Sequence, residues 1–101
     1  MANSELNALW VAHQQMPFPA AARGVELKGI DLVLLDSLAA GCISSLVDPA
    51  GQPDPEKLSL LAELSKQIQA VTVQLDGEVR HYFAHLGGVA EAAFRTGTHH
   101  K

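Results

Sequence analysis

The feature that most constrains the fold of this chain is an apolar run from residue 30 to residue 47, IDLVLLDSLAAGCISSLV. Twelve of its eighteen residues are apolar and none is Pro. The run is longer than a usual strand and contains Ala-Ala-Gly, which is poor strand material, so it predicts a helix. At about 100° per residue, seven apolar side chains fall within an arc of about 140° and predict a core face: Leu32, Leu35, Leu38, Ala39, Cys42, Ile43 and Leu46.

The opposite side of the same helix is neither charged nor bulky. Ser37, Gly41, Ser44 and Ser45 gather there. Small residues spaced about four apart allow a second backbone to approach closely. We therefore expect these four residues to form an interface with another chain.

Eighteen mostly apolar residues also raise the possibility of a membrane span. Asp31 and Asp36 lie within the run, and no basic cluster flanks it. A carboxylate inside a short span costs several kcal/mol. The run is therefore interpreted as the buried helix of a soluble protein, and no membrane partner is expected.

Length and composition favour one domain over residues 1–101 that associates with itself. The chain is 48% apolar and only 18% charged, although a small protein has much surface to cover with polar groups. We expect a homo-oligomer, with a dimer favoured, and allow for a further protein partner.

Charge and cysteine content narrow the expected partners and compartment. The net charge is −4 and the basic residues are scattered, so the electrostatic footprint of a nucleic-acid binder is missing. No secretory signal is visible at the N-terminus, and the single Cys42 cannot form an internal disulfide. We expect a cytoplasmic protein that does not bind nucleic acid.

The remaining sequence predicts an all-α bundle of three to four helices, at about 4–15, 30–47, 55–75 and 78–95, completed by dimerisation. The first helix ends before Met16-Pro17, because Pro disfavours helical geometry in the preceding residue. The third has a clear start in Asp54-Pro55-Glu56, which combines a cap, a Pro at the first helical position and an early acid.

Two connections allow more than one interpretation. Asp76-Gly77 signals a turn, but the apolar face continues in phase across it, so we favour one long or kinked helix over residues 55–95 and keep a break as the alternative. Such a helix would span about 60 Å and would need a second chain to cover its ends. Residues 20–23 could form a short turn of helix, and Val25 to Lys28 alternates like a strand with no evident partner in this chain, so for residues 20–29 we favour an extended connector over a strand paired across a two-fold axis. Gly97 is a plausible helix terminator, and residues 96–101 are predicted to be a disordered tail.

One pattern suggests a metal ligand set. Glu78, His81 and His85 have the spacing ExxHxxxH, and two imidazoles four residues apart on a helix can chelate one ion. Only one copy is present, and the three residues lie beside the apolar face rather than within it. A solvated helix face is the competing interpretation.

Two polar residues are expected near the core. His13 shares the apolar face of the first helix, and Asp36 lies at the margin of the central helix. Because an unpaired carboxylate is penalised by desolvation, Asp36 should pair with a cation or a backbone amide. A structural polar pair and a ligand pocket formed by these two residues both remain open.

No arrangement of residues typical of catalysis is present, and no cofactor is predicted. The leading hypothesis is a small helical protein–protein interaction or scaffold module that self-associates. The alternative is a bundle that binds a metal or small ligand through Glu78, His81 and His85 or through a pocket at His13 and Asp36.

Overall fold

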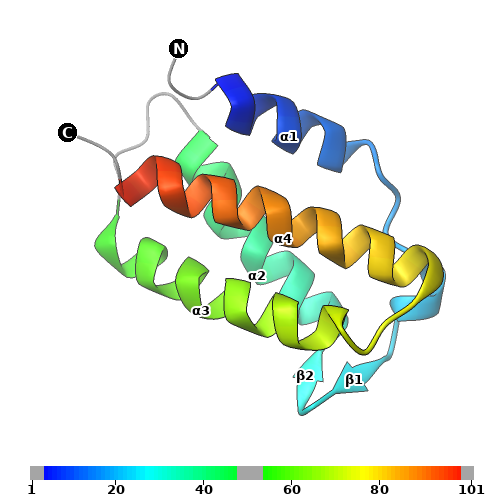
Figure 1. Cartoon of the computed structure of the whole chain (residues 1–101). Coiled ribbons are helices and arrows are strands. Elements are labelled where there is room, and N and C mark those ends of the chain that lie inside the picture. The colour runs from blue at the N-terminus through cyan, green and yellow to red at the C-terminus, as the bar shows by residue number, and fades with distance from the viewer. Residues whose placement is uncertain (1–3, 48–53, 99–101) are drawn as a thin grey trace.

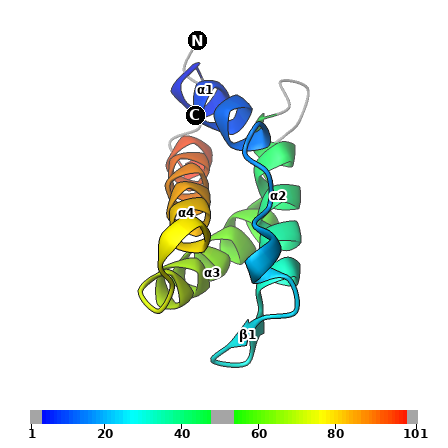
Figure 2. The same ribbon diagram turned by 90° about the vertical axis from the view of Figure 1, so that its right-hand side faces the viewer.

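The fold is an all-α bundle, as the sequence predicts. The computed structural model describes residues 4–47 and 54–98, which contain four α-helices. These are α1 (Ser4–Gln14), α2 (Leu32–Val47), α3 (Pro55–Thr72) and α4 (Gly77–Thr98). α4 contacts each of the other three and lies between α1 and α3 (Figure 1). The view turned by 90° shows α2 on the side of the bundle away from α4 (Figure 2).

The core is almost entirely aliphatic and is formed mainly by α2, α3 and α4. Phe83 of α4 is its largest fully buried side chain. The other large side chains with almost no exposed surface come from all four helices: Leu6, Leu32, Leu35, Ile43, Leu61, Ile68, Leu86, Val71 and Val89. The radius of gyration is 13.1 Å, close to the value of about 13 Å for a compact monomer of this length. One copy of the chain therefore covers its own core.

The central helix is confirmed, with two corrections. It begins at Leu32 rather than residue 30, because Asp31 caps it: the Leu34 amide donates to Asp31 Oδ1 at 3.1 Å. Leu38, predicted in the core face, is 42% exposed. It lies at one edge of the predicted arc, and the buried residues of α2 lie within the rest of that arc.

Residues 20–29 are not a simple connector. They form the short 3-10 helix η1 (Ala20–Ala22) and the strand β1 (Glu26–Leu27), which pairs antiparallel with β2 (Ile30–Asp31). Lys28 and Gly29 both have positive φ, 53° and 77°, as a two-residue hairpin turn requires. The strand partner judged absent from this chain is thus the segment that follows it directly. The hairpin projects from one end of the bundle (Figure 1).

The favoured continuous helix over residues 55–95 is wrong, and the break is correct. α3 ends at Thr72, and four residues, 73 to 76, form the connection to α4. Gly77 has a φ of +61°. This value lies outside the right-handed helical region, so α3 and α4 cannot form one continuous helix through Gly77. Val73, within this connection, is 72% exposed. The argument that a long helix needs a second chain therefore no longer applies.

The remaining boundaries are close to those predicted. The start of α3 is confirmed, since Asp54 Oδ1 accepts from the Glu56 amide at 2.9 Å. α4 extends to Thr98, so residues 96–98 are helical and not a disordered tail. Gly97 does not terminate the helix; a Cβ there would overlap the Leu58 side chain. Residues 48–53 and the last three residues of the predicted tail lie outside the described residues.

None of the helices in the described ranges combines the length and hydropathy needed to cross a membrane.

Candidate functional site

The polar groups of the bundle meet where α1 packs on α4. His13 of α1, predicted to face inward, is only 4% exposed. Its Nδ1 lies 3.0 Å from Nδ1 of His85 on α4, and the two rings are nearly parallel, at 5°. The His13 ring also lies 4.7 Å from the ring of Tyr82 and 6.2 Å from that of Trp10. His13 is therefore held among three aromatic rings with one hydrogen bond.

The hydrogen bond between the two imidazoles needs one ring to carry a proton on Nδ1. Nε2 of His13 is buried without a hydrogen-bond partner among the described residues, whereas His85 is only half-buried. If His13 accepted, its Nε2 would hold a buried, unpaired N–H, which is costlier than an unpaired lone pair. We therefore assign His13 as the donor and His85 as the acceptor.

Burial keeps His13 uncharged. Desolvation, followed by the neighbouring His85, lowers the pKa of His13 from 6.5 to about 4. At neutral pH His13 is thus an uncharged hydrogen-bonding group between two helices. A charge on its ring would face both desolvation and repulsion from His85.

The partner of Asp36 is a tyrosine hydroxyl and not the expected cation or backbone amide. The Tyr82 hydroxyl donates to Asp36 Oδ1 at 2.7 Å, which joins α4 to α2. Desolvation raises the pKa of Asp36, and the Tyr82 hydrogen bond opposes that shift. Burial and the Asp36 carboxylate both raise the pKa of the Tyr82 hydroxyl. His13 and Asp36 are therefore connected through Tyr82, without contacting each other.

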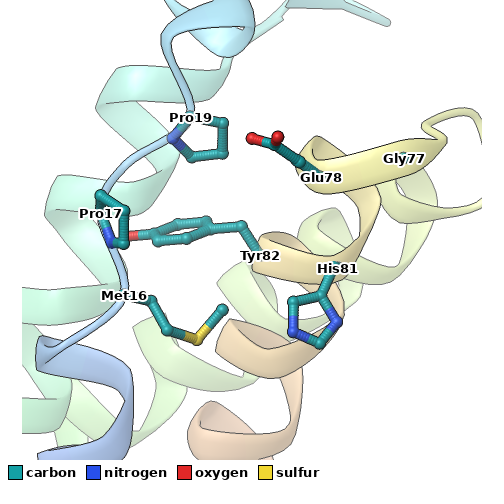
Figure 3. Close-up of a pocket in the computed structure, with 7 residues that line it drawn as sticks. All are labelled: Met16, Pro17, Pro19, Gly77, Glu78, His81 and Tyr82. Carbon is teal, nitrogen blue, oxygen red and sulfur yellow. The ribbon is translucent and has the colours of Figure 1, made fainter.

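A solvent-facing slot of about 490 Å³ opens beside Tyr82. We call it the Tyr82 slot, and its lining residues are Met16, Pro17, Pro19, Gly77, Glu78, His81 and Tyr82. Figure 3 shows Met16 and the two prolines, from the segment after α1, facing Glu78 and His81 from the start of α4. The Tyr82 ring extends from α4 toward Pro17 between these two walls. Pro19 and Tyr82 are buried, whereas Glu78 and His81 are exposed.

The predicted metal ligands are divided between two environments. Glu78 and His81 line the Tyr82 slot, whereas His85 is engaged by His13. Within residues 4–47 and 54–98, no three His, Cys, Asp or Glu side chains come together so that they could hold an ion.

The predicted interface residues lie on the outer side of α2. Ser37, Gly41 and Ser44 are exposed and Ser45 is half-buried. Ser45 Oγ accepts from Lys57 Nζ of α3 at 2.7 Å. Cys42 is buried, and desolvation raises the pKa of its thiol, consistent with the predicted core position.

Sequence reasoning missed the central role of Tyr82, whose helical spacing fits an apolar face. It also missed Met16, Pro17 and Pro19, which belong to the segment that ends the first helix. The one available signal is a Met-Pro-Phe-Pro segment whose fixed backbone presents apolar side chains.

Comparison with protein-family models, with curated proteins and with solved structures finds no match to this chain.

Proposed function

We propose that this protein is a small helical interaction module that self-associates through the outer face of α2. We define this face by its residues: Val33, Leu34, Ser37, Leu38, Gly41, Ser44 and Ser45. The observation that carries the proposal is the exposure of its large apolar side chains, 56% for Leu34, 42% for Leu38 and 37% for Val33. Contiguous exposed apolar side chains are typical of interaction surfaces.

The occupant that suits this face best is a second copy of the chain. Two copies carry a net charge of −4 each and repel one another in general. The outer face of α2, however, carries no Asp, Glu, Lys or Arg. The Lys57 ammonium from α3 reaches only its edge, at Ser45, so two copies can come together here with little repulsion.

The face also allows close packing. A Cβ added to Gly41 would meet no atom within 4 Å, so the surface around it is open. Flanked by Ser37 and Ser45, it forms a shallow strip of small residues beside the ridge of Leu34 and Leu38. A two-fold axis lets the ridge of each copy lie on the small-residue strip of the other, which is an isologous interface.

The neighbouring helix extends the apolar area. The hydrogen bond from Lys57 to Ser45 places the start of α3 beside the end of α2. The helices run antiparallel, so Leu60, one turn after Lys57, lies level with Gly41, one turn before Ser45. Leu60 is 43% exposed and belongs to the same proposed interface.

Sedimentation velocity tests the proposal. We expect a dimer of the 10.7 kDa chain at micromolar concentration. The double variant Leu34→Glu/Leu38→Glu places two carboxylates in each half of the interface and should give monomers, whereas Val73→Glu, at an exposed apolar residue in the α3–α4 connection, should not. A 10.7 kDa species throughout the micromolar range would contradict the proposal.

Gly41→Leu separates association from folding. Its side chain points into open space in one copy, so the substitution should stabilise α2 by a few tenths of a kcal/mol up to about 1 kcal/mol. The same side chain would hold a second copy away. A stabilised monomer supports the proposal, and an unchanged dimerisation constant contradicts it.

A further inference from the structure

The Tyr82 slot lies where the segment after α1 meets the start of α4. None of its lining residues belongs to the outer face of α2. Its volume of about 490 Å³ falls within the range of small-molecule sites, about 300–1,000 Å³. Its lining also has their usual composition, with apolar side chains and few polar groups. The polar groups then decide which ligands the slot accepts.

The negative charge of the slot comes from Glu78. Among the residues that the structure describes, Glu78 makes no hydrogen bond or ion pair with another side chain. No Lys or Arg lines the slot. The Glu78 carboxylate extends toward Pro19 across the opening (Figure 3), so it faces an apolar wall instead of a partner.

The other groups do not favour an anion. Tyr82 has committed its hydroxyl proton to Asp36, so it has none to offer a ligand. The amide groups at the start of α4 contribute about half a positive charge. That is less than the full negative charge of Glu78, which lies in the same first turn. The slot as a whole is negative.

The apolar wall sets the second requirement. Pro17 and Pro19 offer rigid apolar surface, and the flexible Met16 side chain extends it, with its thioether across from His81 (Figure 3). Methionine adapts well to aromatic rings. A ligand that satisfies both walls has an apolar, preferably aromatic, body and a positively charged group that donates hydrogen bonds.

We propose that the Tyr82 slot binds a small organic cation, an amine or amidine carried on an aromatic body. The charged nitrogen donates to the Glu78 carboxylate, and the ring lies against Met16 and Pro19. His81 closes the same side of the slot and offers one ring nitrogen. This site involves no metal and is independent of the proposed dimer.

Tryptamine is the test ligand, with tryptophol as its neutral analogue and indole-3-propionate as its anionic analogue. Titration of the ¹⁵N-labelled full chain, followed by amide shifts, measures affinity and location together. We expect tryptamine to bind with a Kd of about 1 mM, in line with its small size. The shifts should centre on Met16, His81 and Tyr82, and both analogues should bind at least fivefold more weakly.

Glu78→Gln removes the charge with little change in shape, and Glu91→Gln is its control on an exposed position of the same helix outside the slot. Tryptamine affinity should fall about fivefold or more in the first variant, because a charge-assisted hydrogen bond is lost, and should not change in the second.

Three results would overturn the proposal: tryptophol binding as tightly as tryptamine, equal weakening by the two Gln variants, or no shifts with any of the three compounds up to about 10 mM. The variant Leu34→Glu/Leu38→Glu should leave tryptamine affinity unchanged. The ligand site and the dimer can therefore fail separately.

Discussion

α4 packs against α3 on one side and α1 on the other, and the two contacts differ in chemistry. The buried side chains that α3 contributes are all aliphatic: Leu61, Leu64, Ile68 and Val71. α1 contributes His13, which meets His85 and Tyr82 of α4. The first contact depends on shape alone, whereas the second also depends on protonation. α4 therefore has one side, toward α3, whose packing does not depend on pH, and another side, toward α1, whose packing does.

The largest expected effect tests the aliphatic contact. Ile68→Ala removes a side chain that is 1% exposed, so we expect the free energy of unfolding to fall by about 3 kcal/mol through lost burial and a cavity. Because no ionisable group of α3 takes part, the loss should be the same at pH 7 and at pH 5. Urea unfolding at both values checks this. A loss that changes by more than about 1 kcal/mol between them would break the comparison.

The titratable contact should weaken in acid. The pKa of His13 is about 4 in the folded protein and 6.5 for an unperturbed histidine, so the unfolded chain binds the proton first as pH falls. The contribution of the uncharged His13 to the free energy of unfolding is complete above pH 6.5, and it is lost as the pH falls toward 4. Between pH 7 and pH 4.5 we expect a loss of about 2 kcal/mol attributable to His13.

His13→Leu isolates this effect. Asp36 contributes with the opposite sign, because its raised pKa lets the folded state bind a proton first and gain stability in acid. Subtracting the unfolding curves of His13→Leu from those of the native chain at each pH removes that contribution. The free energy of unfolding of the native chain minus that of the variant should fall by about 2 kcal/mol on acidification. A constant difference would show that His13 titrates normally.

Part of this comparison was predictable from the sequence. Helical periodicity placed His13 on the apolar face of α1, and local capping residues placed the start of α3 at Asp54. These are short-range properties. The partner of His13 lies 72 positions away, and no local pattern identifies it.

The errors share a physical cause. Periodicity continued through the α3–α4 connection because Leu75 and the apolar residues of α4 stay in phase with those of α3, yet Gly77 takes a positive φ that the pattern does not encode. The hairpin was missed because Lys-Gly is a less usual occupant of a two-residue turn than Asn-Gly. Leu38 was placed in the core because the wheel gives an arc and not the direction of the neighbouring helices.

Tyr82 extends the titratable side of α4 to Asp36 of α2, and Tyr82→Phe tests that connection. The change keeps the ring and removes the hydrogen bond to Asp36, so we expect a loss of about 1 kcal/mol at pH 7. Since that bond lowers the pKa of Asp36 against the effect of burial, the pKa of Asp36 should rise further. A ¹³C carboxyl titration measures it, and an unchanged pKa would mean that the hydroxyl does not hold the carboxylate.

The smallest effect examines how tightly α3 and α4 fit, using two adjacent glycines of α4. A Cβ at Gly88 meets no atom within 4 Å, whereas a Cβ at Gly87 lies 3.2 Å from Cγ2 of Ile68. Gly88→Ala should stabilise the protein by about 0.5–1 kcal/mol through helix propensity. Gly87→Ala gains the same propensity but must displace Ile68, so its benefit should be smaller by several tenths of a kcal/mol.

A double-mutant cycle shows whether Ile68 is responsible. In the Ile68→Ala background the obstructing Cγ2 is gone, so Gly87→Ala should recover the benefit seen for Gly88→Ala, with a positive coupling between positions 68 and 87. Gly88→Ala should have the same effect in both backgrounds. Equal gains in the free energy of unfolding from Gly87→Ala and Gly88→Ala in the native chain would mean that Ile68 moves aside at little cost. The aliphatic side of α4 would then be no more rigid than its titratable side.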